Sequence, residues 1–234
     1  MKRLIVALLL CAGLASAQTV LQEFSAVSSG AGTISDMDLP SPTASGSVLI
    51  TMPLLLTPDV KVISVTDNAP GGGNTYKQVP NTYGVCKKQS VDIWYCENCK
   101  AGVTELKIHL SDHVRASINT FLEVSGLATT SVLDGSGVHL SDGSATKDGL
   151  EAGPKLTTTA KDFVIARYFS EPPLPSGVTP KQWTFTKSYA YVLSGAAGDY
   201  QPTFNETKAG SNYCDSMAAF KVAEPGAAVP QPAH

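Results

Sequence analysis

Two consecutive stretches in the middle of the chain alternate apolar and polar residues, and they define the class of fold. In residues 103–110 and again in residues 114–125, the even-numbered positions form one largely apolar face, while the odd-numbered positions are mostly polar. This period-two alternation predicts β-strands, each with one face turned to a core. Together with the strand-like segment that begins at Ser90, they predict three consecutive antiparallel strands across residues 90–126.

Shorter apolar runs, bounded by Gly, Pro, Asn and Asp, predict the remaining strands. Residues 48–56 form an apolar run typical of a strand buried on both faces, in which Pro53 predicts a bulge or a strand end because it cannot donate a hydrogen bond. Further strands are predicted at residues 18–29, 60–66, 75–79, 156–159, 162–169, 183–193, 200–205 and 214–222. Loops or turns are predicted at residues 30–47, 67–74, 80–89, 127–154 and 171–181, with at most one short strand in the first of these.

No segment shows a sustained helical period, so strands do not alternate with helices. Many short strands separated by Gly- and Pro-rich turns are typical of an all-β protein. The sequence therefore predicts an antiparallel two-sheet β-sandwich, and its long loops favour a jelly-roll or an elaborated immunoglobulin-like arrangement.

The N-terminus has the pattern of an export signal. Lys2 and Arg3 precede an apolar run over residues 4–14, and Ala15-Ser16-Ala17 matches the small-x-small pattern of a cleavage site. We predict a signal peptide at residues 1–17, which removes Cys11, a single sandwich domain at 18–223, and a disordered Pro/Ala tail at 224–234. Since no other apolar run reaches spanning length, no transmembrane segment is predicted after cleavage, and the mature chain is expected to be secreted, extracellular or periplasmic.

Charge argues against nucleic acid as a partner. Only 16% of residues are charged, and the formal net charge is −3. The longest cationic run is Lys87-Lys88. Neutralising a phosphate backbone requires clustered cations, so no nucleic-acid partner is predicted.

Several short motifs occur along the chain in a characteristic order. They are Val65-Thr66-Asp67, Gly73-Asn74-Thr75-Tyr76, Trp94-Tyr95 and Glu123-Val124-Ser125-Gly126. On these, the chain resembles a family of uncharacterised secreted bacterial β-sandwich domains with V-T-D…G-N-T-Y, W-Y and E-Y-S-G signatures, over residues 46–222. The resemblance implies a fold and an extracellular setting, and it assigns no catalytic or ligand-binding residue. The chain departs from the family in its cysteines and in having Val124 where Tyr is frequent.

The four cysteines that remain after cleavage predict two disulfides in an oxidising compartment. An extended strand would hold Cys86 about 20 Å or more from Cys96, which favours Cys96–Cys99 together with Cys86–Cys214. A Cys96–Cys214 bond is the main alternative. Zinc binding and redox activity are weaker readings, because a redox C-x-x-C needs a helix N-terminus and this one follows a strand.

Aromatic residues form a candidate ligand site. Trp94, Tyr95, Trp183 and Tyr191 are candidates for a platform that stacks on sugar rings, although either Trp94 or Tyr95 is expected to pack between the sheets. Adjacent strand positions point to opposite faces, so one ring of that pair would face the core and the other would not.

Carboxylates and histidines add little further chemistry. Asp134, Asp142 and Asp148 are calcium candidates because their carboxylates cluster in one loop, but each is followed by glycine, and Asp-Gly commonly marks a turn. His109 and His113 are predicted to be surface residues on either side of a turn. No other cofactor is expected.

No catalytic motif is present: there is no Gly-x-Ser-x-Gly, His-Glu-x-x-His or phosphate-binding loop. A glycosidase needs two converging carboxylates, and nothing in the sequence brings Glu97, Glu123 and Asp162 together. We therefore predict a non-catalytic secreted protein that binds an unknown extracellular protein or glycan at a cell surface or in a matrix. A carbohydrate-binding module is the alternative, and a carbohydrate-active enzyme is a weaker one.

Overall fold

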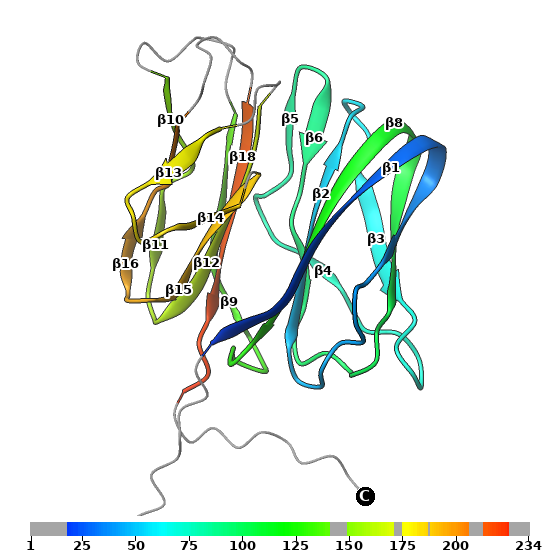
Figure 1. The fold of residues 1–234 in the computed structure, drawn as a ribbon, viewed down its shortest axis with the longest axis horizontal. Coiled ribbons are helices and arrows are strands. Elements are labelled where there is room, and N and C mark those ends of the chain that lie inside the picture. Colours follow the sequence, from blue (N-terminus) through cyan, green and yellow to red (C-terminus); the bar gives the residue numbers. More distant parts are fainter. Residues whose placement is uncertain (1–17, 141–148, 171–174, 187, 206–212, 225–234) are drawn as a thin grey trace, which may run out of the picture.

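The computed structural model describes residues 18–140, 149–170, 175–186, 188–205 and 213–224, and this part of the chain is built from strands (Figure 1). The strands are β1 (Thr19–Asp38), β2 (Val48–Leu55), β3 (Val62–Asp67), β4 (Lys77–Gln78), β5 (Gly84–Cys86), β6 (Gln89–Val91), β7 (Trp94–Cys96), β8 (Glu105–Ser125), β9 (Leu133–Leu140), β10 (Leu150–Ala152), β11 (Leu156–Thr158), β12 (Asp162–Ser170), β13 (Gly177–Thr179), β14 (Thr184–Thr186), β15 (Tyr189–Gly195), β16 (Gly198–Tyr200), β17 (Thr203–Asn205) and β18 (Tyr213–Lys221).

Two antiparallel sheets form the body of the molecule. The first has eight strands in the order β1-β8-β2-β6-β5, with β3 paired to β8 and β7 paired to β2 and β4. The second has five strands in the order β14-β15-β12-β18-β9. The predicted all-β antiparallel sandwich is confirmed. The structure adds two small sheets that the sequence did not predict, β10-β17-β13 and β11-β16.

A hydrophobic layer joins the two main sheets. Alternate residues of β2, including Ile50 and Met52, pack with Phe163 of β12 and Phe220 of β18. Tyr95 contributes its ring from β7 and meets Phe220 edge to face, at 5.4 Å between ring centroids. Burial of these apolar side chains is the main force that holds the sheets together.

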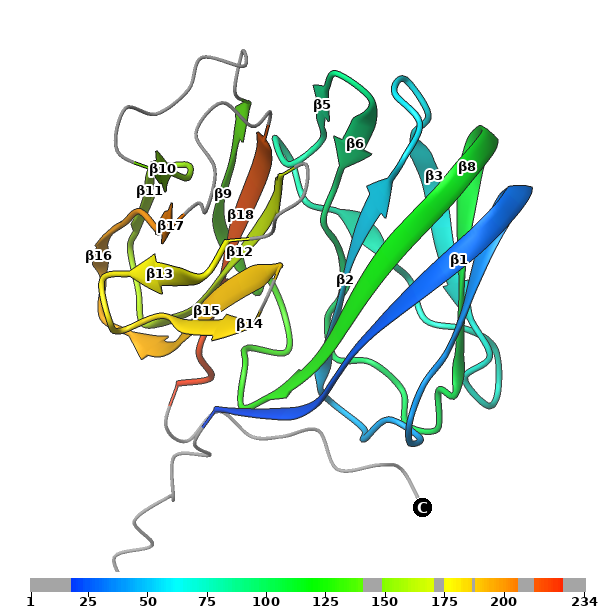
Figure 2. The same ribbon diagram turned by 45° about the horizontal axis from the view of Figure 1, so that its top comes forward.

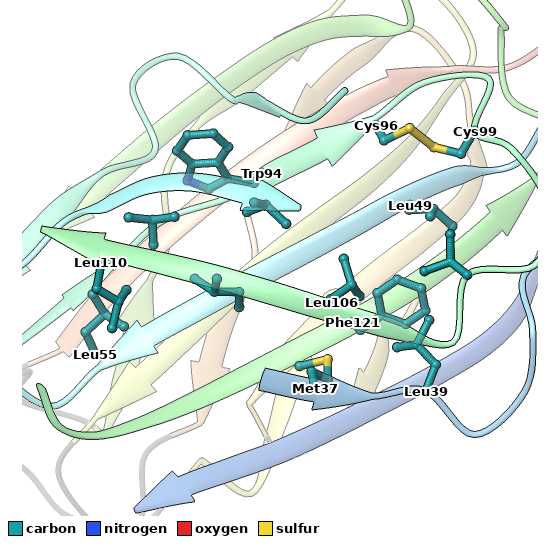
Figure 3. Packing of buried hydrophobic residues seen from close by; sticks show 14 of the residues in the cluster. Met37, Leu39, Leu49, Leu55, Trp94, Cys96, Cys99, Leu106, Leu110 and Phe121 are labelled. Carbon is teal, nitrogen blue, oxygen red and sulfur yellow. A yellow bond between two sulfur atoms is a disulfide. The ribbon is translucent and has the colours of Figure 1, made fainter. Parts of the chain in front are cut away.

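A second core lies inside the eight-stranded sheet, because its longest strands bend over their own sheet. β1 and β8 are 20 and 21 residues long. One arm of β8 pairs with β2, and the other pairs with β3. Met37 and Leu106 from the folded-over arms thereby pack against the cluster that contains Leu49, Trp94 and Phe121 (Figure 3). A third core, with Trp183 and Phe204, covers the outer face of the five-stranded sheet.

The prediction of three consecutive antiparallel strands at residues 90–126 was wrong. Residues 103–110 and 114–125 belong to one bent strand, β8, whose register against β1 shifts between Gly32 and Ile34. β7 pairs with β2 and β4 instead of β8. The alternation of apolar and polar residues correctly predicted strand structure on both sides of residues 111–113. Alternation alone cannot distinguish a bend within one strand from a turn between two strands.

Four predicted loops contain strands. β1 continues to Asp38, β5 lies in residues 80–89, β9 and β10 lie in residues 127–154, and β13 lies in residues 171–181. Glycine in β9 has a packing role that its turn-like composition conceals, since a Cβ on Gly135 would lie 2.7 Å from Leu156 Cδ1. The predicted strand at residues 75–79 is shorter in the structure, where β4 covers only Lys77–Gln78 and pairs with β7.

Pro53 causes neither a bulge nor a strand end, so that prediction was wrong. β2 keeps an unbroken register with β8 through Pro53, which lies opposite Asn119. On its other edge, β2 pairs with β7 up to Thr51 and with β6 from Leu54. The missing N–H of the proline thus falls where β2 changes partner, and no ladder hydrogen bond is lost there.

The disulfide Cys86–Cys214 joins the two main sheets, from β5 to β18, with a Cα–Cα distance of 6.0 Å. Cys96–Cys99 closes on itself at the end of β7. The favoured pairing is confirmed, and the alternative of Cys96 with Cys214 was wrong. Both cystines are buried in apolar surroundings, one of them beside Leu54 and Phe169.

The predicted signal peptide lies outside the described residues, and so does the predicted tail from residue 225 onward. Within the ranges that the structure does describe, no helix is long and apolar enough to cross a membrane.

Candidate binding site at one end of the sandwich

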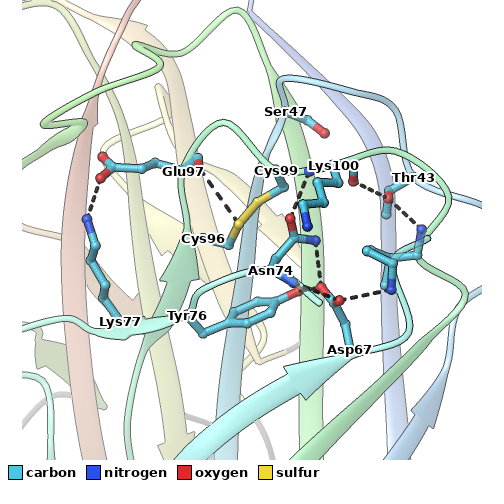
Figure 4. Close-up of a disulfide and its surroundings, with 12 residues drawn as sticks. Thr43, Ser47, Asp67, Asn74, Tyr76, Lys77, Cys96, Glu97, Cys99 and Lys100 are labelled. Atoms are coloured by element: carbon cyan, nitrogen blue, oxygen red, sulfur yellow. Dashed lines mark hydrogen bonds and ion pairs between the residues drawn. A yellow bond between two sulfur atoms is a disulfide. The ribbon is translucent and has the colours of Figure 1, made fainter. Parts of the chain in front are cut away.

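The Cys96–Cys99 turn organises one end of the eight-stranded sheet. The chain reverses through Asn98, which adopts a positive φ of 50°. Two backbone hydrogen bonds then tie the turn to the segment before β2: Gly46 N donates to Cys99 O at 2.8 Å, and Cys99 N donates to Ser47 O at 2.9 Å. The disulfide therefore fixes a point at which three loops meet (Figure 4).

Asp67 holds the neighbouring loop. Its carboxylate accepts hydrogen bonds from Ala69 N at 3.0 Å, from Asn74 N at 3.0 Å and Nδ2 at 2.7 Å, and from Tyr76 Oη at 2.9 Å. Asn74 Oδ1 in turn accepts from Lys100 N at 2.8 Å, next to the disulfide. Burial, together with the Asp67 carboxylate, raises the pKa of Tyr76, so its phenol stays protonated and acts as a donor. The V-T-D…G-N-T-Y residues thus form one structural unit.

A polar hollow of about 330 Å³ opens beside this turn. It is lined by Gly73, Asn74, Thr75, Lys77, Cys96, Glu97, Asn98 and Lys100. Lys77 pairs with Glu97, whose other oxygen accepts from Val132 N at 3.1 Å. Although burial alone would raise the pKa of Glu97, the hydrogen bonds from Lys77 and Val132 hold it below its usual range.

The second cation of this polar hollow is also bound. Lys100 Nζ donates to Gly72 O at 2.6 Å. The hollow therefore presents amide groups, one ion pair and the hydrogen-bonded ammonium of Lys100, a set of donors and acceptors that suits a hydroxyl-rich ligand.

A larger and mostly apolar hollow of about 400 Å³ is lined in part by residues 44–47. Leu127, Ala128 and Val222 form part of its wall, and Lys221 and Glu224 lie at its rim. Leu127 and Val222 form a β-bridge that connects the two main sheets. The 44–47 segment that lines this hollow is hydrogen bonded to the Cys96–Cys99 turn that lines the polar hollow, and we call the two hollows together the loop end of the molecule.

The four aromatic candidates do not form a platform. Trp94 is 8% exposed and lies in the core of the eight-stranded sheet, while Tyr95 lies in the layer between the main sheets. The two rings do occupy opposite faces of β7, but both are buried. Trp183 is buried in the third core, with Tyr200 at 6.4 Å, and Tyr191 packs half-buried against Phe163.

Asp92 is a buried carboxylate that the sequence analysis did not single out. It accepts hydrogen bonds from Gln78, Thr82, Trp94 Nε1 and its own neighbour Ile93 N. Burial raises its pKa to about 6, although these bonds oppose that shift. The sequence did offer a signal for a buried carboxylate, because Asp92 is a charged residue within an otherwise apolar strand segment. Its role is to connect β4, β6 and β7, and it faces neither hollow.

The calcium candidates are not brought together in the described structure. Asp142 and Asp148 lie outside the described residues. Asp134 is in β9, where Thr159 donates to it from N at 2.7 Å and from Oγ1 at 2.8 Å. Among the described residues there is no group of three His, Cys, Asp or Glu side chains that could hold a metal.

The carboxylates considered for glycoside hydrolysis are engaged separately. Glu123 is buried and accepts from Gln22 Nε2, Ala44 N and Ser47 Oγ at 2.7–2.8 Å. Asp162 lies in the interior beside Asp134, and burial raises its pKa to about 6. Glu123 thus holds loop segments together, and Asp162 is enclosed in the interior, so the two carboxylates do not share a site.

The histidines occupy β8 and β9. His109 and His113 share the strand β8 instead of flanking a turn, and the three residues between them lie at the bend of that strand. His139 is in β9, where its Nδ1 lies 3.9 Å from Asp215 of β18. Its interaction with that buried carboxylate raises the pKa of His139.

Comparisons with known proteins give little. No family model matches the chain, and no curated protein matches it. A search of solved structures found a "Biofilm associated protein - B domain" at 9% identity and a TM-score of 0.27, covering 89% of this chain and 74% of that one. We draw nothing from a match at that TM-score.

Proposed function

We propose that this chain is an exported, non-catalytic β-sandwich protein that binds an extracellular protein or glycan through its loop end, at a cell surface or in a matrix. The observation that carries the proposal is the pair of disulfides. Cys86–Cys214 ties the main sheets together, and Cys96–Cys99 anchors the loop end. Such cross-links persist in oxidising compartments, which fits the signal-peptide pattern and the proposed membership of a secreted bacterial family.

The absence of catalysis is part of the proposal and is supported by how the carboxylates are used. Glu97 and Glu123 hold loops in place through hydrogen bonds to Val132 N and to Ala44 N. A glycosidase would need such groups free to donate or accept a proton at a substrate. Their structural roles favour binding over chemistry.

Export and binding are tested separately. We expect the chain, expressed with its first 17 residues in a bacterial host, to be recovered beyond the inner membrane with Gln18 at its N-terminus and with no free thiol. The exported protein is then incubated with intact cells and with isolated matrix polysaccharide. Retention that falls when Lys77 and Asn98 are changed to Ala supports the loop end as the binding surface. A cytoplasmic product with reduced cysteines, or retention unchanged by those variants, contradicts the proposal.

A carbohydrate-binding module is the second candidate, and the polar hollow favours it. The amide groups of Asn74 and Asn98 line that hollow. On a glycan array, binding that is lost in Asn98→Ala but kept in the surface control Ile63→Ala supports this candidate. Trp183→Ala is unsuitable as a probe, because Trp183 lies in a core.

A further inference from the structure

Residues 22–29 of β1 have a free outer edge within the part of the chain that the structure describes. β1 ends the strand order of the eight-stranded sheet, and its described pairing partner is β8 on one side. Figure 2 shows β1 running along the outside of the sheet for its whole length. An edge strand presents a row of backbone N–H and C=O groups that can template another strand.

The central part of this edge is regular and unprotected. From Gln22 to Ser29 the register with β8 is unbroken, and it shifts only beyond these residues, between Val20 and Gln22 and between Ser29 and Ile34. Natural edges are usually blunted by proline, lysine or bulges. β1 contains no Pro, Lys or Arg, and its bulges lie outside the 22–29 segment.

An apolar side chain is exposed to solvent at this edge, beside neutral or already engaged polar side chains. Val27 is 71% exposed, although it lies opposite Ile118 of β8. Ser25 lies opposite Thr120 on the same face and shares a 2.9 Å hydrogen bond with it. The charge of Glu23 is already engaged, since Tyr189 Oη donates to it at 2.7 Å. An exposed apolar side chain beside an open backbone edge favours docking of an extended strand.

We propose that residues 22–29 of β1 pair antiparallel with the same residues of a second copy of this chain, forming a closed dimer with one continuous sheet. Three features favour a second copy of the chain as the partner. An open backbone edge accepts an extended strand, and β1 of a second copy is itself such a strand. Glu23 is the single charge between Thr19 and Ser35, so two copies bring little repulsion. The flanking bulges limit pairing to a short segment, and the two-fold arrangement uses both edges and closes.

This inference is independent of the proposed binding at the loop end. It is tested on the exported full chain by light scattering coupled to size exclusion, over a series of protein concentrations. We expect a concentration-dependent dimer. Val27→Glu places a charge near the partner's Glu23 and is expected to raise the dimer dissociation constant at least about tenfold, because like charges opposite each other in a sheet are destabilising.

Ile63→Glu is the matched control. Ile63 is 61% exposed on β3, at a different edge of the same sheet. We expect this variant to dimerise as the unmodified chain does. Hydrogen exchange should show protection of the amides of residues 22–29 that increases with concentration. A monomer at every concentration, equal dissociation by both variants, or protection confined to other strands would overturn the inference.

Discussion

The guanidinium of Arg167 in β12 donates a 2.6 Å hydrogen bond to Thr120 Oγ1 in β8, and so connects the two main sheets through their interior. Arg167 is fully buried and also donates to Ser188 Oγ at 2.9 Å. No ion pair involves Arg167 in the described parts of the chain. Burial lowers its pKa to about 10, which reports the cost of holding this charge among neutral groups.

We expect Arg167→Met to unfold at an equal or higher denaturant concentration than the unmodified protein, because a well-packed apolar side chain avoids the desolvation cost. Thr120→Val should lower the free energy of unfolding by roughly 1–3 kcal/mol, since it leaves a buried N–H without an acceptor. Urea denaturation measures both. If Arg167→Met lost more stability than Thr120→Val, the Arg167 charge would be contributing to stability.

The two disulfides should differ in their effect on stability. Cys86 and Cys214 are 128 residues apart, and Cys96 and Cys99 are 3 apart. From the entropy of loop closure alone, changing the first pair to Ser should cost about 5 kcal/mol and changing the second about 2 kcal/mol. Guanidinium titrations of the two double variants test the order, and equal losses would contradict it.

Asp162 should make stability depend on pH. Burial and the nearby Asp134 carboxylate raise its pKa from 3.8 to about 6, so the fold favours the protonated form. This contribution is fully present below the unfolded pKa and is lost as the pH rises through about 6. Asp162→Asn, which resembles the protonated form, should flatten the decline between about pH 4 and 6 in thermal melts across that range.

Asp199 provides the control for that experiment. A hydrogen bond from Lys155, followed by one from Thr157, lowers its pKa, and it lies at the surface. Its contribution therefore has the opposite sign, being present above the unfolded pKa and lost as the pH falls. Asp199→Asn should leave the decline between about pH 4 and 6 in place. An unchanged profile for Asp162→Asn would refute the assignment.

The Asp67–Tyr76 pair should stabilise the loop locally. Tyr76→Phe removes one hydrogen bond to a carboxylate, worth about 1.5–3 kcal/mol. We expect the amide of Asn74, which donates to the same carboxylate, to exchange faster in that variant. Hydrogen exchange by NMR measures this, with Lys77→Ala as a control that leaves the Asp67 contacts intact.

Period-two alternation, export pattern and cysteine spacing were enough to predict an all-β sandwich and its disulfide pairing. Local chemistry carries this information, because strand faces alternate and an extended segment fixes how far apart two cysteines lie. The Asp67, Asn74 and Tyr76 motif was visible in the sequence as well, although its role as a hydrogen-bonded unit was not.

Long-range packing decided the rest. Whether residues 111–113 make a turn or a bend depends on β1, which pairs with both arms of β8, and on β3 and β2, which pair with one arm each. Trp94, Tyr95 and Trp183 looked like ligand candidates, but three separate cores bury them, and alternation cannot distinguish a strand with one buried face from a strand with two. The C-x-x-C segment at residues 96–99 was evident from the sequence. The hollows near this segment could not be predicted, because they are formed by loops that come together from distant parts of the chain.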